Sequence, residues 1–157
     1  MVCRTPLCRR LLGLTPALVL PCLLLLVGCG PVRYDPDLAA RPYPADLPRA
    51  ETADIQLFRD GTAIEIVNAT PVSYEAFNLW INQRFVRSVA SLPAGSSRAL
   101  SLWDFRDERG EVIRAGGFFR TQEPTPVVLA EIETTNEAGE PVLIGLITIP
   151  SELDPRK

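Results

Sequence analysis

The chain has 157 residues, with 16 Lys and Arg against 19 Asp and Glu and no His. Three basic and no acidic residues lie in the first 28 positions, so the remaining 129 residues carry a net charge of −6, which excludes nucleic acid as the expected partner. All four Cys lie at or before position 29, so beyond it disulfides, the common zinc sites and His-dependent triads are excluded, and no metal or other cofactor is expected.

The N-terminus has the layout of an export signal. Residues 1–10 contain three Arg and no acid, and residues 11–27 contain no charge at all. A basic stretch followed by an apolar one predicts a secretory signal peptide, here residues 1–28. A permanent transmembrane helix is the weaker alternative, because 17 helical residues span only ~25 Å of a ~30 Å hydrocarbon core. Pro16 and Pro21 also interrupt the stretch.

The apolar stretch ends in Leu26-Val27-Gly28-Cys29, which resembles the lipobox of bacterial lipoprotein precursors. The resemblance implies diacylglycerol on the sulfur of Cys29, cleavage before that residue and acylation of the new amino terminus. Two or three acyl chains anchor a protein stably to a membrane. Gly30 stands where an Asp would retain the protein in the inner membrane, so the resemblance implies an outer-membrane lipoprotein facing the periplasm. The alternative is a plain signal peptide with a chance Cys.

After Cys29, the segment to residue 52 contains five Pro. Proline disfavours helix interiors and removes donors from strands, so the segment predicts a semi-extended tether with a reach of up to ~70 Å. Tyr34, Leu38, Tyr43 and Leu47 are unusual in a spacer. We expect them to dock either onto the folded domain or onto a partner.

From residue 53 the pattern becomes short β-rich runs separated by turn residues. Asp60-Gly61 and Asn82-Gln83 predict tight hairpin turns. Such runs, joined mostly by hairpins, predict an all-β domain: a single antiparallel β-sandwich of about seven to eight strands over residues 53–150, with a tail at 151–157. The expected strands are 54–59, 62–68, 74–81, 84–90, 98–105, 112–120, 127–134 and 142–149.

An immunoglobulin or fibronectin-III type of sandwich is the first expectation, with Trp80 as a candidate for the buried tryptophan of the third strand. The run 78–85 and the segment 104–119 also look like uncharacterised secreted bacterial proteins, a likeness that implies no activity. The last run, 142–149, is apolar on both faces, which favours a central strand. Gly145 within it indicates a bulge or a close neighbour.

Gly116-Gly117-Phe118-Phe119 is the first candidate contact site. Successive strand residues face opposite sides, and two glycines permit a bulge that redirects the pair. One interpretation is an exposed aromatic that grips a sugar or a protein. The alternative is one core Phe and one Phe covered by the tether.

Trp80, Trp103 and Tyr74 could line a carbohydrate platform, although rings at strand spacing are more commonly core residues. Glu131 and Glu133 share one strand face, but a glycosidase needs carboxylates placed across a cleft. We therefore expect no enzyme.

The acidic residues from Asp104 to Glu111 crowd one turn together with Arg106 and Arg109. A calcium site is conceivable because hard cations bind carboxylates, but the spacing differs from that of an EF-hand. A solvated hairpin turn with local ion pairs is the preferred interpretation.

The sequence thus predicts a non-catalytic binding or assembly module that is held at a membrane through Cys29. Its expected partner is another envelope protein, contacted through Phe118, Phe119 or the sheet edge near residues 84–90. The alternative is a carbohydrate- or peptidoglycan-binding module that uses exposed aromatics, with Trp80 and Trp103 as candidates.

Overall fold

The computed structural model describes residues 36–118 and 122–149. The chain divides into two units, Met1–Val32 and Arg33–Lys157, and every described residue lies in the second. Cys29 with the lipobox, Phe119 and the tail 151–157 lie outside the described residues.

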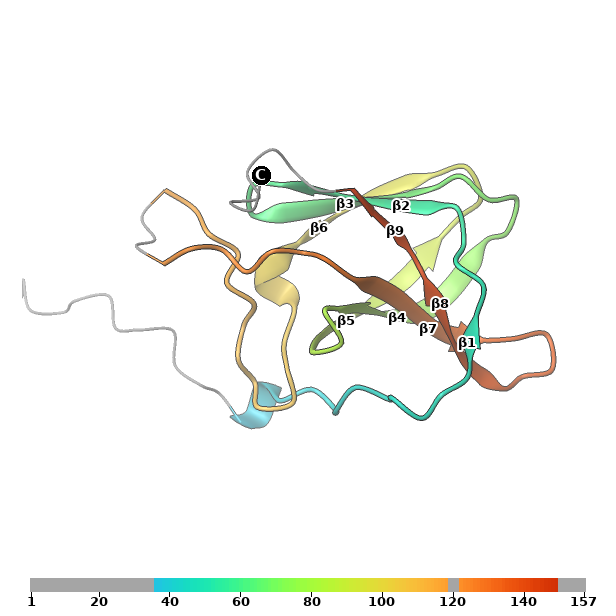
Figure 1. Ribbon diagram of the computed structural model, residues 1–157, viewed down its shortest axis with the longest axis horizontal. Helices are drawn as coiled ribbons and strands as arrows, with labels where there is room; N and C mark the ends of the chain where they lie inside the picture. Colours follow the sequence, from blue (N-terminus) through green and yellow to red (C-terminus); the bar gives the residue numbers. More distant parts are fainter. Residues whose placement is uncertain (1–35, 119–121, 150–157) are drawn as a thin grey trace, which may run out of the picture. The chain divides into compact units, whose positions relative to one another are not determined.

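Strands dominate the described unit and form two sheets (Figure 1). The five-stranded sheet has the order β1-β8-β7-β4-β5, and the four-stranded sheet has the order β6-β3-β2-β9. The prediction of an all-β sandwich is confirmed. The elements are η1 (Pro36–Leu38), β1 (Arg49–Ala50), β2 (Ile55–Asp60), β3 (Ala63–Asn68), β4 (Tyr74–Ile81), β5 (Phe85–Leu92), β6 (Ser97–Ser101), η2 (Leu102–Asp104), β7 (Ala130–Thr135), β8 (Pro141–Gly145) and β9 (Ile147–Ile149).

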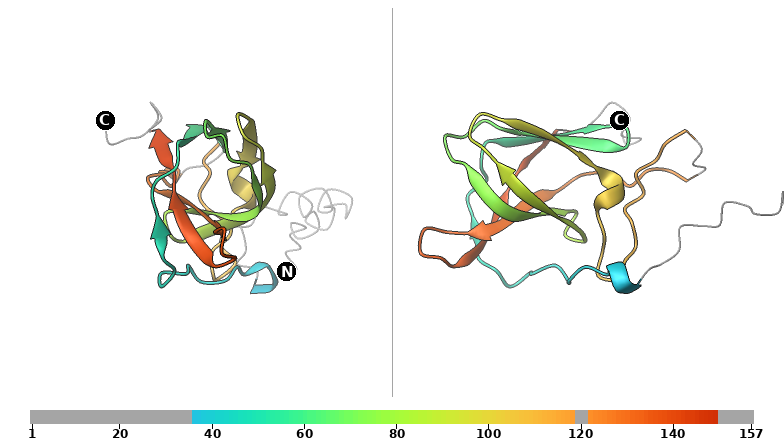
Figure 2. Two further views of the ribbon diagram at one scale, coloured as in Figure 1. Left: turned by 90° about the vertical axis from the view of Figure 1, so that its right-hand side faces the viewer. Right: turned by 180° about the vertical axis from the view of Figure 1, so that it is seen from behind.

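The core lies between the two sheets, which lie one above the other in the right-hand view of Figure 2. Alternation places inward-facing residues of the longer strands in this core. In the four-stranded sheet Ile55 and Leu57 of β2 are fully buried, and in the five-stranded sheet Leu79 and Ile81 of β4 are their counterparts. Phe105, beyond β6, is also fully buried.

Two hairpin turns set the register of the antiparallel pairs. Asn82 and Gln83 have φ angles of 52° and 55°, and the amide of Arg84 donates to the carbonyl of Ile81 at 3.1 Å, which confirms the expected tight turn. The first hairpin turns one residue later than expected. Asp60 still pairs with Ala63, so the turn residues are Gly61, with φ 54°, and residue 62.

The apolar run 142–149 is not one central strand, which corrects the prediction. The amide of Leu146 donates to the carbonyl of Ala130 at 2.9 Å, and there the chain passes from one sheet to the other. β8 lies inside the five-stranded sheet, whereas β9 runs parallel to β2 at the edge of the four-stranded sheet. The run is apolar on both faces because its halves serve different sheets. The close neighbour expected for Gly145 is confirmed: a Cβ there would lie 3.0 Å from Thr52 Oγ1.

Two other expected strands are shorter or missing. The run 98–105 is a strand only to Ser101, whose side chain accepts from the amide of Trp103 and starts η2. The described part of 112–120 contains a single bridge, between Val112 and Arg106, and no strand.

Residues 40–50, here called the strap, cross the outer side of the five-stranded sheet (Figure 1). The amide of Ala40 donates to the carbonyl of Asp107 at 2.9 Å, and the amide of Leu143 donates to the carbonyl of Pro48 at 2.9 Å. β1 then pairs in parallel with β8. The described part of the expected spacer therefore includes a segment bound to the domain.

Candidate functional site

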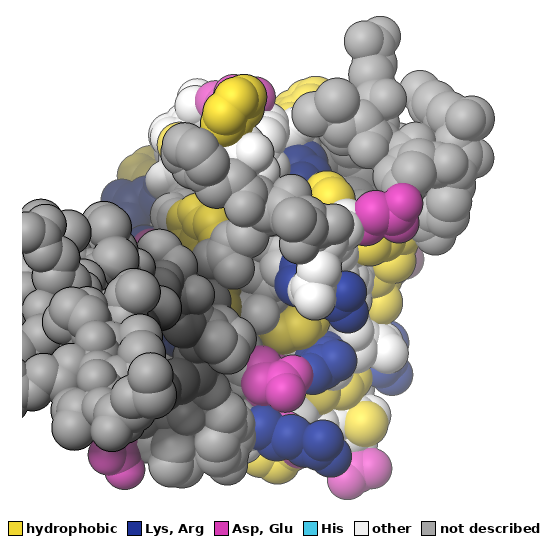
Figure 3. Space-filling view, turned by 90° about the vertical axis from the view of Figure 1, so that its left-hand side faces the viewer, with side chains coloured by type: hydrophobic (Ala, Val, Ile, Leu, Met, Phe, Trp, Pro, Cys, Tyr) yellow, Lys and Arg dark blue, Asp and Glu magenta, His cyan; other side chains and the backbone are white. Residues whose placement is uncertain are grey.

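The loop that carries Phe118 leaves the sandwich at one end and is fixed at its base by Arg59. The Arg59 guanidinium donates to the carbonyl oxygens of Gly61 at 3.2 Å, Ala115 at 2.8 Å and Thr125. Phe118 is 96% exposed. The end of the domain from which this loop projects carries charged side chains of both signs with hydrophobic ones between them (Figure 3).

Gly116 and Gly117 set the course of this loop. Their φ angles are 86° and 110°, in the region that side-chain-bearing residues rarely adopt. A Cβ on Gly116 would also lie 3.2 Å from Cβ of Pro124. The glycines therefore replace the expected strand by a loop on which Phe118 is exposed. That this ring contacts a sugar or a protein stays a prediction.

Trp80 is fully buried, but not between the sheets. Its neighbours Leu79 and Ile81 point into the inter-sheet core, so the indole lies on the outer face of β4, beneath the strap. The ring of Tyr43 meets it edge-on at 5.3 Å between centroids, and the Arg41 guanidinium lies 5.7 Å from its centroid. Trp80 therefore offers no surface to a ligand in this conformation, and it differs from the inter-sheet tryptophan of immunoglobulin-type domains.

Glu131 and Glu133 of β7 lie side by side under the strap. Tyr43 donates its hydroxyl to Glu131 Oε2 at 2.7 Å, and Arg49 Nε lies 3.4 Å from Glu131 Oε1. Glu133 accepts from Trp80 Nε1 at 2.8 Å and pairs with Arg41. The two carboxylate side chains are 6% and 11% exposed, so the two half-exposed guanidiniums compensate charges that are almost out of water.

Tyr43 keeps its proton in this arrangement. Burial, and then the hydrogen bond to Glu131, raise the pKa of Tyr43 above its ordinary value, while Arg49 acts in the opposite direction. The phenol is therefore a hydrogen-bond donor at neutral pH, as the contact with a carboxylate requires.

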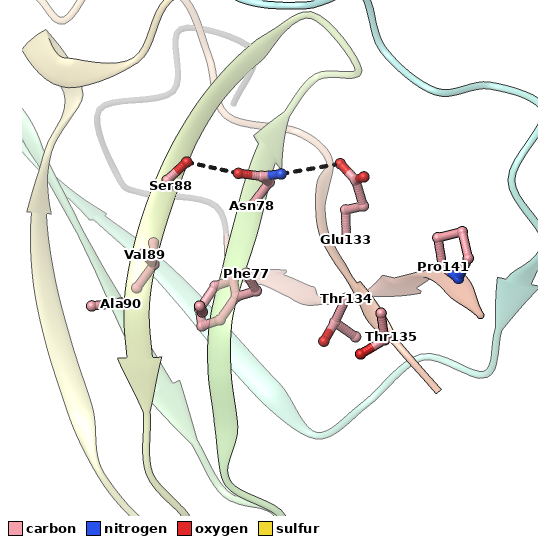
Figure 4. A pocket seen from close by; sticks show the side chains of 10 residues that line it. Phe77, Asn78, Ser88, Val89, Ala90, Glu133, Thr134, Thr135 and Pro141 are labelled. Atoms are coloured by element: carbon pink, nitrogen blue, oxygen red, sulfur yellow. Dashed lines mark hydrogen bonds between the residues drawn. The ribbon is translucent and has the colours of Figure 1, made fainter. Parts of the chain in front are cut away.

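A groove of about 510 Å³ lies on the same sheet face beside the strap (Figure 4). The Ser88 hydroxyl donates to Asn78 Oδ1 at 2.8 Å, and Asn78 Nδ2 lies 3.5 Å from Glu133 Oε2. Hydroxyl, amide and carboxylate groups thus converge on one side of the groove. The lining residues are Ala76, Phe77, Asn78, Ser88, Val89, Ala90, Glu133, Thr134, Thr135 and Pro141.

The acidic turn is organised by one buried carboxylate. Asp107 is 1% exposed and accepts from Arg84 Nε at 3.0 Å, Arg84 Nη2 at 2.7 Å and the amides of Arg109 and Glu111. Burial alone would raise the pKa of Asp107, but the bonds from Arg84 and the two amides lower it overall. The expected local ion pair is present between Glu108 and Arg109, whose atoms lie 4.0 Å apart. The buried Asp107 differs from the expectation, because its cation is Arg84 of the β4–β5 turn.

The remaining candidate residues make packing contacts or ion pairs within the domain. Trp103 is partly buried and packs against the core cluster. Tyr74 meets Phe77 edge-on at 6.5 Å between centroids. Asp104 pairs with Arg87 at 2.9 Å. Among the described residues no three His, Cys, Asp or Glu side chains form a metal-binding group. Nor does this part of the chain contain a helix long and apolar enough to cross a membrane.

Docking of Tyr43 onto the domain was one of the two expected alternatives, but the sequence alone did not identify Trp80 and Glu131 as its partners. Two signals for this contact were present: aromatic residues in a proline-rich segment, and two glutamates on one strand face. Nothing in their spacing connects residues that are 88 to 92 positions apart.

No protein-family model matches the chain, and neither does any curated protein or solved structure. The geometry of the described residues is therefore what supports a function.

Proposed function

We propose that this chain is a lipid-anchored protein of the bacterial cell envelope whose β-sandwich binds another envelope protein without catalysing a reaction. The anchor is supported by the basic and apolar stretches that precede Leu26-Val27-Gly28-Cys29. Gly30 supports the outer membrane, facing the periplasm, as the location. The net charge of −6 after residue 28 disfavours nucleic acid as the partner.

The strap limits how far the sandwich can stand from the lipid. Among the described residues, the first backbone bond from this segment to the domain is made by Ala40. Even fully extended at ~3.5 Å per residue, the chain from Cys29 to Ala40 spans no more than about 38 Å. The length of chain between Cys29 and the attachment point at Ala40 is therefore roughly half the reach expected of a free tether.

The observation that carries the binding role is the exposure of Phe118. Phe118 is 96% exposed, and its loop is fixed at the base by the partly buried guanidinium of Arg59. The ring therefore presents a large apolar surface to a partner at little entropic cost. Loops on rigid scaffolds are also where binding residues concentrate. Phe118 is thus the proposed centre of the contact.

Photo-crosslinking tests this role. We expect a photoreactive phenylalanine at position 118 of the full-length chain, expressed in its own host, to give a discrete adduct with one envelope protein. The same probe at Val128, which is 51% exposed, serves as the matched control. Adducts that are identical at the two positions, or absent at both, would remove the proposal.

The anchor has its own test. We expect Cys29→Ser to abolish lipid attachment and cleavage before residue 29, and to release the chain from the membrane fraction. Mass spectrometry of the amino terminus and fractionation give the answer. Cys22→Ser, in the middle of the apolar stretch, should change neither property.

Saccharide binding is a second candidate, favoured by the groove beside the strap rather than by tryptophans. Asn78, Ser88 and Glu133 present the amide, hydroxyl and carboxylate groups that bind sugar hydroxyls. We expect soluble peptidoglycan fragments to shift the side-chain amide resonance of Asn78, and Ser88→Ala to weaken that response. A resonance that stays in place at millimolar saccharide would exclude this candidate.

A further inference from the structure

The strap is held to the sheet mainly by side chains. Its backbone bonds are those of Ala40, Pro48 and the two residues of β1. Pro42 and Pro44 have no amide hydrogen to add. Segments with few backbone bonds and half-exposed ion pairs open at lower free energy than the core strands. The strap is therefore the element of the described unit that separates first.

An open strap leaves an unbalanced surface on the sheet. Glu131 and Glu133 lose both guanidiniums, and the indole of Trp80 loses the ring of Tyr43. Because the strap is what keeps the two carboxylates out of water, the opened face is an acidic, hydrated surface with an uncovered indole beside it. The exposed face therefore selects an extended segment that carries one Arg two residues before a Tyr and a second Arg further on.

The segment with that chemistry is the strap of another copy. We propose that two copies of this chain exchange straps, so that Arg41, Tyr43 and Arg49 of each copy bind Trp80, Glu131 and Glu133 of the other. Glu51 and Thr52, which are exposed and lie between strap and β2, act as the hinge. The contacts made in the exchanged pair are the same as those within one chain. The equilibrium between the exchanged pair and two separate chains is therefore set by the hinge and by the local concentration of the chains.

Matched charge reversals test the exchange. One full-length chain carries Glu133→Arg and another carries Arg41→Glu, each with a different affinity tag and purified in detergent. Alone, each variant opposes like charges at the strap contact, both within a chain and between identical copies. Mixed, each strap meets a site of opposite charge in the other variant, so only the mixed pair can satisfy both contacts.

We expect the mixed variants to co-purify about tenfold or more above either variant paired with itself. In a Trp103→Phe background, mixing should also shift Trp80 emission to the blue. A chain carrying both Arg41→Glu and Glu133→Arg has matched charges in cis and reports whether the reversed pair still folds. A second pair, Arg49→Glu with Glu131→Arg, repeats the test at the other contact. Co-purification at the level of the same-variant controls for both pairs would overturn the proposal.

Discussion

Asn68, at the end of β3, joins strands that belong to different sheets. Its side chain is fully buried, and Nδ2 lies 2.8 Å, 3.2 Å and 3.1 Å from the carbonyl oxygens of Val72, Leu92 and Pro93. Its Oδ1 accepts from the amide and the hydroxyl of Thr70. One amide group thus satisfies backbone groups that the strand ladders leave unpaired where β3 and β5 end.

Asn68→Ala should therefore be strongly destabilising. We expect the free energy of unfolding to fall by about 2–4 kcal/mol, because several buried backbone groups lose their partner at once. Urea titration measures the change. Asn136→Ala is the matched control, since Asn136 makes similar bonds to the amides of Ala138 and Glu140 in an exposed turn. Equal losses for the two variants would contradict the role assigned to Asn68.

Asp107 makes stability depend on pH in a defined direction. Its folded-state pKa lies below the ordinary 3.8, because the bonds from Arg84 and two amides outweigh burial. The stabilisation is therefore fully present above that ordinary value and is lost as pH falls below it, through the folded-state pKa. We expect wild type to exceed Asp107→Asn by about 1–3 kcal/mol at pH 7, with the difference shrinking below pH 3.8.

Unfolding curves between pH 7 and pH 2.5 measure this difference. Glu111→Gln is the control, because Glu111 shares Arg84 but its side chain is 52% exposed, and its loss should cost less than about 0.5 kcal/mol. A gap between wild type and Asp107→Asn that widens in acid would show that the sign is wrong.

The strap is the element whose removal has the clearest optical signal. Tyr43→Ala should uncover the indole of Trp80, shift its emission to the red in a Trp103→Phe background, and destabilise the domain by about 1–3 kcal/mol. Tyr43→Phe keeps the edge-on contact and loses only the hydroxyl bond to Glu131. It should leave the emission unchanged; a red shift of equal size would mean that the ring does not cover Trp80.

An element could be predicted well where the local pattern of apolar, polar and turn residues determines its structure. The runs of β2 and β4 lie between clear turn signals, and their bounds are 55–60 and 74–81 against the expected 54–59 and 74–81. The run 142–149 was misread because a strand that serves two sheets looks like one strand buried on both faces. The prediction of a strand over 112–120 was wrong because Gly116 and Gly117 take positive φ angles, which the alternation of apolar and polar residues does not encode.

The candidate site was only partly predictable for a similar reason. Phe118 could be singled out because adjacent phenylalanines after two glycines are a local signal. The partners of Glu131 and Glu133 could not be predicted in this way. Arg41 and Arg49 lie more than 80 residues away in the sequence, and it is the path of the strap over the sheet that places them beside the two glutamates. Contacts of that separation depend on the complete topology, which no short window of sequence contains.

In the described unit as a whole, two sheets form a dry core and the strap adds a partial, polar third layer outside it. The core strands are held by continuous ladders and full burial, such as the pairing of Leu79 with Ile132. The strap is held by ion pairs and few backbone bonds. These two kinds of attachment predict two levels of local stability within one folded unit.

Amide hydrogen exchange along β8 tests that prediction within a single strand. Neighbouring strand residues direct their amides to opposite sides. The amide of Leu143 donates to Pro48 of the strap, whereas Ile144 has Ile132 of β7 as its ladder partner. Strap opening frees only the first of these amides, so we expect Leu143 to exchange about tenfold or more faster than Ile144. Tyr43→Ala should widen this ratio, and equal exchange at the two residues would mean that the strap opens only when the whole sandwich unfolds.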